Sequence, residues 1–431
     1  MDELPQLILI EILSRLHDAA DLSRCRVASK TLNHLSGDVH ALTIICSSDR
    51  VLKTRSPGPY RITPFRAYWM TPFKSIVSSL IFRPKRLRSI SIGFENTHVR
   101  INDDREVEAD DLWLTSVDFV SEWLPIIGSG LSSLSISDFW NQSCRRESRV
   151  LRLISNSSEG RLLNTDEVGS KSSRTRRHDD EYLKKVNECF PSLRVLKLIR
   201  VEGIAEHTIH LLQLRICHWT GSNVPMSLTV HAPNLIELKL QCVQPISLVI
   251  KSPLLSVFDL STEKSVHFID IEEFCNLKTL KIHTHGFNDP MMMIPWGKAV
   301  ESLVLDAPKW DETDLWELGS IERLIFTFPY LKSVVLGPTV CYELQCCFEA
   351  GGPSLCLTHG WDNLKKLWIQ LVIENVGLTY SFFCFVLNLS PVVSDVEAVV
   401  HWKVADNFQH SFKAKCAKDY PRIKWSWSEW A

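Results

Sequence analysis

The chain has 431 residues, of which 45% are hydrophobic and 23% charged, a composition that is ordinary for a soluble folded protein. Its formal net charge of -2 gives no electrostatic reason to expect nucleic acid or a membrane surface as a partner. Because one compact core rarely extends beyond about 300 residues, the length predicts two or three folded units or a repeat array.

Three features of the sequence predict a location in the cytoplasm and/or nucleus. Asp2 and Glu3 stand where a secretory signal would carry positive charge. The most apolar late stretch, residues 378–393, is interrupted by polar residues and Pro391, so it falls short of a membrane span. The 13 cysteines are odd in number and scattered, which favours reduced thiols that act mostly as small core residues.

The first 36 residues predict short helices that cannot bury all of their own apolar surface. Pro5 suits the first position of a helix, which we expect to end near Leu16, and Asp21 can cap a second helix. Two apolar stripes follow at helical spacing, one with Ile8, Ile12 and Leu16 and a neighbouring one with Leu9, Leu13 and Leu16. Because about 40 residues of short helices rarely form an independent core, the surplus apolar face needs the rest of the chain or a partner.

The segment from Leu4 to Leu35 resembles the F-box, the adaptor-binding motif of Skp, cullin and F-box (SCF) ubiquitin ligases. The resemblance rests on an ordered set of pieces, which are Leu4-Pro5, Ile8-Leu9, Glu11-Ile12-Leu13-Ser14-Arg15-Leu16, Asp21-Leu22, Cys25-Arg26 and Ser29-Lys30. The chain departs from the family at Leu7, Ala28 and Leu32, where the family usually has a polar residue, a larger aliphatic residue and Trp, respectively. The alternative is an amphipathic helical pair that packs on the chain's own repeats.

The F-box resemblance implies which side chains contact the adaptor. The expected contacts are Leu4, Pro5, Ile8, Ile12, Leu16, Leu22, Lys30 and Leu32. Leu9, Leu13 and Cys25 are expected to fill the interior of the helical unit instead.

A recurring apolar phrase follows the helical segment. Its form is apolar, two variable residues, apolar, one variable residue, apolar, as in Leu87-Arg88-Ser89-Ile90-Ser91-Ile92. Later copies start at residues 193, 211, 235, 255, 277, 300 and 321, a spacing that suits leucine-rich repeats of about 20 to 29 residues. The last two apolar positions lie two residues apart and share one face of a strand, so each unit buries that face by stacking on the next.

Proline-containing prefixes such as Phe190-Pro191-Ser192 and Ala232-Pro233-Asn234 resemble those in the leucine-rich repeats of plant F-box proteins. The fold expected from this resemblance is α/β, a short N-terminal F-box helical unit followed by an irregular leucine-rich-repeat solenoid. Helical patterns between the strands are short, so we expect irregular or one-turn helical returns. The alternative is a twisted sheet in an ordinary α/β domain.

These patterns divide the chain into five regions. They are an F-box at 1–40, a leucine-rich-repeat-like region at 41–140, a flexible polar insertion at 141–186, a solenoid at 187–390 and a C-terminal cap at 391–431. The insertion lacks aromatic residues between Asn141 and Glu181. Its basic run, Lys171 to Arg177, is interpreted either as a solvated linker or as an import signal or phosphorylated switch. The cap is inferred from Trp402, Trp425, Trp427 and Trp430.

No motif predicts a catalytic centre, a metal or a cofactor. Cys341, Cys346, Cys347, Cys356 and His359 are close in sequence but lack the Cys-x-x-Cys spacing of zinc sites, which favours core or loop cysteines. His283 and His285 follow a repeat strand without further recognisable ligands. The sequence also has no Gly-rich phosphate loop and no Gly-x-Ser-x-Gly motif.

The variable residue between the last two apolar positions should stack from repeat to repeat into a surface column. In order, the expected column is Lys197, Arg215, Lys239, Asp259, Lys281, Val304, Ile325, Val335 and Trp368. A basic half that runs into an apolar half would suit an acidic and apolar target, with Lys197, Arg215, Lys239, Lys281 and Trp368 as target-binding candidates. A solvated sheet face is the alternative.

By its resemblance, the chain is expected to be the non-catalytic substrate-recognition subunit of an SCF-type ubiquitin ligase. The implied partners are a Skp-family adaptor, through it a cullin, and an unknown target protein, with no nucleic acid or membrane. The first alternative is a leucine-rich-repeat interaction scaffold without ligase association. An enzyme with a metal at Cys341 to His359 is the second alternative.

Overall fold

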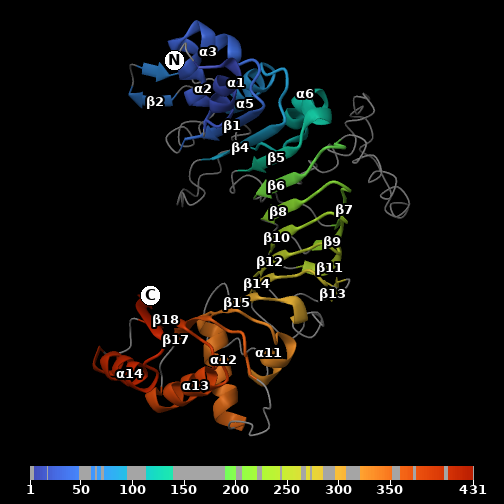
Figure 1. The fold of residues 1–431 in the computed structure, drawn as a ribbon. Coiled ribbons are helices and arrows are strands. Elements are labelled where there is room, and N and C mark those ends of the chain that lie inside the picture. Colours follow the sequence, from blue (N-terminus) through green and yellow to red (C-terminus); the bar gives the residue numbers. More distant parts are fainter. Residues whose placement is uncertain are drawn as a thin grey trace. The chain divides into compact units, whose positions relative to one another are not determined.

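The computed structural model describes residues 4–16, 18–47, 60–63, 66–68, 72–94, 113–138, 190–199, 206–220, 226–242, 245–263, 268–271, 274–284, 297–306, 321–351, 360–371, 375–401 and 406–430. The chain forms two compact units, residues 1–235 and 236–431 (Figure 1). Each unit combines helices with a ladder of parallel strands, so the α/β class expected from the sequence is confirmed. Within the described residues, no helix combines the length and apolar character needed to cross a bilayer.

The first unit begins with three short helices, α1 (Gln6–Ser14), α2 (Ala19–Ala28) and α3 (Lys30–Leu35). Pro5 is the N-cap of α1 and not its first helical residue as predicted, and its carbonyl accepts the amides of Ile8 and Leu9. Ser29 ends α2 and caps α3 by accepting the amide of Leu32 at 3.4 Å.

The repeat strands of the first unit pair in parallel in a ladder, called the open ladder from here on. Their order is β1 (Ala41–Cys46), β4 (Ser89–Phe94), β5 (Ser133–Ser137), β6 (Val195–Ile199) and β8 (Ile216–Thr220). Alternate residues such as Ile90, Ile92, Leu196 and Leu198 are buried on one face. The first unit also contains the helices α5 (Phe73–Ile81) and α6 (Val117–Ile127), a short 3-10 helix (Gly128–Gly130) and the hairpin of β2 (Tyr60–Thr63) and β3 (Arg66–Tyr68).

The open ladder of the second unit follows the same plan. Its parallel strands lie in the order β10 (Glu237–Cys242), β12 (Val257–Thr262), β14 (Thr279–His283), β15 (Ser302–Asp306), β16 (Ser333–Leu336), β17 (Lys366–Leu371), β18 (Asp395–His401) and β19 (Lys424–Trp430). The phrase residues Leu280, Ile282, Leu303 and Leu305 are all fully buried. The stacking predicted from the phrase is therefore present over these strands.

The prefix before each strand is a tight turn with a buried first residue. In Phe190–Leu193, Ala232–Leu235 and Phe274–Leu277, the amide of the last residue donates to the carbonyl of the first. Asn234 and Asn276 each donate from the side-chain amide to the backbone carbonyl of the preceding turn, at 2.8 Å and 2.9 Å. The prefixes thus link one repeat to the next.

The segments that return from one open-ladder strand to the next correct the expected short, irregular returns. Strands β7 (Glu206–His210) and β9 (Met226–His231) pair in parallel in the first unit, as β11 (Pro245–Lys251) and β13 (Phe268–Ile271) do in the second. Later returns contain the helices α11 (Ile321–Thr327), α12 (Pro338–Gly351), α13 (Val376–Asn388) and α14 (Asp406–Asp419) and a 3-10 turn (Gly297–Ala299). Longer returns bury larger apolar faces, such as Phe382 and Phe383 of α13, and therefore form complete helices.

Two predicted repeat strands were wrong. Residues 321–326 belong to helix α11, in which Phe326 is 87% exposed, and the strand of that repeat is β16. The copy that starts at Leu211 is shifted, because Leu211 and Leu214 form the turn before β8. The buried residues of this strand are Cys217 and Trp219, which the apolar phrase does not include because neither residue is aliphatic.

The region divisions predicted from the sequence stay predictions. The polar insertion at 141–186, including its basic run, lies outside the described residues, as do Trp402 and the side chain of Trp430. In the region expected to be a cap, β18 and β19 continue the ladder. Trp425 and Trp427 stack with 5.4 Å between ring centroids and face Phe383 and Phe412 of α13 and α14.

Candidate functional site

Four exposed apolar side chains of the helical unit lie on or just before α1, and a fifth, Val27, lies on α2. Leu7 is 81% exposed and Ile12 48%, and Leu4 and Ile8 are also exposed. Leu9 and Leu13, on the opposite side of the same helix, are buried, as their predicted interior role requires. A nine-residue helix that turns three large apolar side chains to solvent, with Leu4 just before it, leaves a face that a partner can cover, at about 25 cal/mol for each Å² removed from water.

The other predicted adaptor contacts fall into an accessible group and a buried group. Pro5 and Lys30 are exposed and Leu16 is half-buried, so these three are accessible to a partner. Leu22 is only 2% exposed and packs inside the unit, so we move it from the contact set to the interior. Leu32 is also nearly buried. The adaptor-binding role of the accessible residues stays a prediction.

A cavity of about 520 Å³ lies among α1, α2 and α3. It is lined by Leu9, Arg24, Cys25, Ala28, Ser29, Thr31 and Leu32. Cys25 is half-buried in this wall, which corrects its expected interior position. Ala28 and Leu32, which stand where the family frequently has larger side chains, both face the cavity. The space can accept an apolar side chain of a partner.

Hydrogen bonds fasten α1 to the start of the open ladder. Ser14 Oγ lies 3.1 Å from His40 Nδ1 and accepts the His40 amide at 3.2 Å. His40 Nε2 lies 3.5 Å from the Glu11 carboxylate, and the His40 carbonyl accepts the amides of Arg88 and Ser89 as β4 begins. His40 thus connects the helix with the exposed apolar face to β1 and β4.

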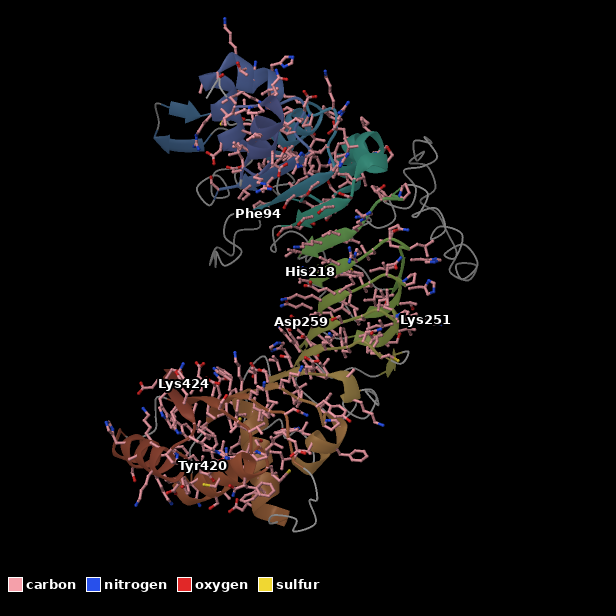
Figure 2. The ribbon with its side chains drawn as sticks, viewed as in Figure 1. Phe94, His218, Lys251, Asp259, Tyr420 and Lys424 are labelled. Atoms are coloured by element: carbon pink, nitrogen blue, oxygen red, sulfur yellow. The ribbon has the colours of Figure 1, made fainter. Side chains whose placement is uncertain are left out.

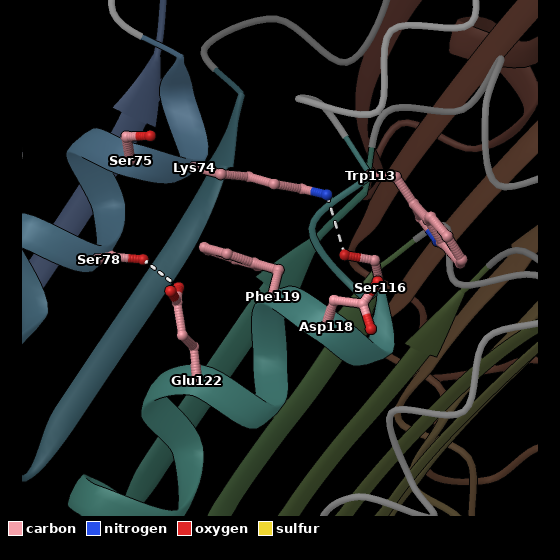
Figure 3. Close-up of a pocket in the computed structure, with 8 residues that line it drawn as sticks. All are labelled: Lys74, Ser75, Ser78, Trp113, Ser116, Asp118, Phe119 and Glu122. Atoms are coloured by element: carbon pink, nitrogen blue, oxygen red, sulfur yellow. Dashed lines mark hydrogen bonds between the residues drawn. The ribbon is translucent and has the colours of Figure 1, made fainter. Parts of the chain in front are cut away.

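A second cavity, of about 500 Å³, lies between α5 and α6 (Figure 3). Lys74 Nζ donates to Ser116 Oγ at 2.9 Å and lies 5.6 Å from the centre of the Phe119 ring. Ser78 Oγ donates to the Glu122 carboxylate at 2.9 Å. These bonds join the two helices, and we assign no ligand to this cavity.

The buried carboxylate of Asp138 holds the segment that leads into α6. It accepts the amides of Leu114 at 2.6 Å and Thr115 at 3.0 Å, together with the Thr115 hydroxyl. Burial raises the pKa of Asp138 to about 7, against the opposing influence of these donors and of Lys74. Asp138 thus joins the end of β5 to the segment that precedes α6 by hydrogen bonds.

The strand register defines the surface column that the sequence predicted. In the first unit the column is Thr43, Ser91, Ser135, Lys197 and His218. In the second unit it is Lys239, Asp259, Lys281, Val304, Val335, Trp368, Glu397 and Ser426. In Figure 2, Asp259 of this column lies on one side of the repeats, and Lys251, on the return strand β11, lies on the other side.

Two expected members are absent from the column. Arg215 precedes β8, and His218 occupies the register position opposite Lys197. Ile325 is buried on α11. In addition, Lys239 Nζ lies 3.5 Å from the Asp259 carboxylate, so the basic half contains an ion pair. Lys197, Lys239, Lys281 and Trp368 stand on the open face as predicted, and their role in target binding stays a prediction.

Comparison with known proteins decides the family. No family model matches the chain. The chain is 37% identical over 452 aligned residues to the F-box/LRR-repeat protein At4g29420 of Arabidopsis thaliana, and the match covers 100% of this chain and 98% of the relative. The chain belongs to the plant F-box/LRR-repeat proteins. F-box/LRR-repeat proteins are generally non-catalytic adaptor subunits.

The cysteines of this F-box/LRR protein that were weighed as zinc ligands lie partly on α12. Cys341 is fully buried, and burial raises the pKa of its thiol. Cys346 and Cys347 are half-buried on the same helix, and Cys356 and His359 lie outside the described residues. In the described part of the chain, no three His, Cys, Asp or Glu residues gather to hold a metal ion.

Two titratable residues of the surface column, His218 and Glu397, were missed by sequence reasoning. His218 lies between the buried residues Cys217 and Trp219. A phrase that allowed cysteine and tryptophan at its apolar positions would have predicted His218 as the column residue of β8. Glu397 follows Trp368 in the column, but its strand lies after the point where the repeat spacing loosens.

Proposed function

We propose that this F-box/LRR protein is the substrate-recognition subunit of an SCF-type ubiquitin ligase. The observation that carries the proposal is the set of exposed apolar side chains on and just before α1, Leu4, Leu7, Ile8 and Ile12, while Leu9 and Leu13 on the other side of α1 are buried. Family membership supports the same role at a coarser level. The α1 face would bind a Skp-family adaptor and, through it, a cullin.

The proposed mechanism is proximity rather than bond chemistry. The open face of the parallel ladders would hold the target protein while the adaptor holds the ligase core. Tethering both partners raises their effective concentration, which can reach the millimolar range for a short connection. The His40 contacts with Glu11 and Ser14 support this division, because they fix the adaptor-binding helix to the first ladder strands. We place this activity in the cytoplasm and/or nucleus.

The second candidate is a leucine-rich-repeat scaffold without ligase association. It is favoured by the helical-unit cavity, since Ala28 and Leu32 offer little apolar area to an adaptor there. In this case the α1 face would be covered by a different protein.

Reconstitution separates the two candidates. The purified chain is mixed with a Skp-family adaptor, a cullin with its RING partner, and a ubiquitin-charged conjugating enzyme. The ligase proposal predicts a stable assembly on size exclusion and ubiquitin transfer to lysines of the chain itself, both lost in Ile12→Asp. A folded parent chain that neither assembles nor receives ubiquitin leaves the scaffold.

A further inference from the structure

An apolar strip interrupts the polar open face of the second unit. Val304, Val335 and Trp368 occupy directly paired positions on the adjacent strands β15, β16 and β17. All three side chains are half-buried on the face opposite the repeat core. Tryptophan is among the residues that most often dominate binding energy at protein interfaces, and nothing in the repeat core requires a ring at this position.

Opposite charges stand at the two ends of the strip. Lys281 precedes Val304 in the column, and Glu397 follows Trp368. The nearby ionic groups are already engaged, since Lys239 pairs with Asp259 at 3.5 Å and His283 Nδ1 lies 3.9 Å from the Asp306 carboxylate. In the part of the chain that the structure describes, neither Lys281 nor Glu397 makes an ion pair.

On one side the strip is bordered by two serines and, beside Trp368, by the exposed Lys366. Ser302 and Ser333 stand two positions before Val304 and Val335 on the same strands. On the other side Gly337 follows β16, and a Cβ there would lie 1.9 Å from Asp306 Oδ1. Because Gly337 has no side chain, the Asp306 carboxylate can lie against the end of β16, beside the strip. A partner backbone can approach the strip closely over the serines.

We propose that this strip binds an extended segment of the target protein that carries an acidic residue, then apolar residues, then a basic residue. The acidic residue would meet Lys281, the apolar residues would cover Val304, Val335 and Trp368, and the basic residue would meet Glu397. The proposal rests on the function proposed above, because it names the target chemistry of the same open face.

The ladder fixes the spacing of the charges in the segment. Lys281 and Glu397 are four strand steps apart, about 19 Å at about 4.8 Å a step. An extended chain advances about 3.3 Å for each residue, so the acidic and basic residues should be separated by about six positions. Either chain direction satisfies this order.

Selection from a library tests the proposal without an adaptor. Random 12-residue peptides displayed on phage are panned on the immobilised full chain, and an enriched peptide is synthesised for titration. The expected peptides have opposite charges about six positions apart with apolar residues between them. Trp368→Ala should weaken binding of the synthetic peptide at least about tenfold. Val257→Ala, an apolar residue on the same face outside the strip, should leave binding unchanged.

A charge exchange gives the sharpest result. Glu397 is exposed, so Glu397→Lys should fold normally, and circular dichroism and melting check this. It should weaken the parent peptide at least about tenfold, and replacement of the peptide's basic residue by Glu should restore binding. No enrichment, equal binding to Trp368→Ala, or absence of this rescue overturns the strip proposal. Failure of the ligase proposal would show separately, as a chain that selects these peptides but binds no adaptor.

Discussion

The helical unit and the parallel ladders of this F-box/LRR protein place their apolar residues differently. In the ladders, the phrase residues such as Leu280 and Leu303 are fully buried. In the helical unit, Leu9 and Leu13 are buried, while Leu7, Ile8 and Ile12 of the same helix face solvent. The apolar phrase residues of the ladders are thus buried within the fold, whereas half of the large apolar side chains of α1 remain exposed and available to a partner. Substitutions in the two regions should therefore have opposite consequences for stability and binding.

The largest expected effect on stability is a truncation of the ladder phrase. Leu280→Ala removes a fully buried side chain and should destabilise the second unit by about 2–5 kcal/mol. Ile8→Ala, in the exposed set, should change stability by less than about 0.5 kcal/mol. Hydrogen exchange followed by mass spectrometry reports each unit separately. Equal protection losses for the two variants would break the comparison.

A backbone contact between repeats comes next. A Cβ on Gly360 would lie 2.1 Å from the Leu389 carbonyl oxygen, which accepts the Trp361 amide at 2.7 Å. Neither group can move without breaking the link between β17 and the turn before β18, so Gly360→Ala should cost about 1–3 kcal/mol. Gly130→Ala is the control, since its nearest contact would be an ordinary 3.5 Å. Equal unfolding midpoints in urea for the two variants would disprove this contact.

A single buried hydrogen bond should matter less. Trp361 Nε1 donates to the Phe328 carbonyl at 3.1 Å, and the indole is fully buried. Trp361→Phe keeps most of the ring but leaves the carbonyl without this donor, so the second unit should lose about 1–2 kcal/mol. Trp425→Phe, which removes a longer 3.4 Å bond from a half-buried ring, is the matched control. A larger loss in the control would contradict the ranking by burial.

A further expected effect is a pH dependence confined to the first unit. Because burial raises the folded pKa of Asp138 to about 7, the folded state retains its proton longer than the unfolded chain, whose Asp pKa is about 3.9. Stability should therefore fall as pH rises from about 4 to 7. Asp138→Asn should flatten this fall, and the exposed Asp118→Asn should not. Melting curves between pH 5 and 7.5 that stay parallel for all three proteins would refute the contribution.

The phrase predicted most of the ladder strands that the structure describes. Leu87 to Ile92 produced β4, and Leu277 to Ile282 produced β14. It failed at β8, where cysteine and tryptophan fill the buried positions, and at Ile321 to Phe326, where spacings of three and two residues also fit a short helix. The return segments could not be predicted, since short apolar runs fit both a strand and a helix until a neighbouring repeat covers one face.

The candidate surfaces were predicted in part for a related reason. Local spacing located the apolar positions of α1 and α2, but it could not say which of them the neighbouring helices cover, so Leu22 of α2, which is buried, was placed among the contacts. The surface column was found from repeat position alone, and its errors at Arg215 and Ile325 repeat the two strand errors. The Ser14 and His40 contact joins residues 26 positions apart and leaves no local pattern.

The most direct test of the account is calorimetric titration of a Skp-family adaptor into three purified chains. Ile12 and Val392 are each 48% exposed, but only Ile12 lies on the α1 face. We expect tight binding by the parent and by Val392→Asp, and a loss of about a hundredfold or more in Ile12→Asp, since a charge placed in an apolar contact costs several kcal/mol. Parent-like binding by Ile12→Asp, or an equal loss in Val392→Asp, would contradict the claim that this face is the one the fold leaves for its partner.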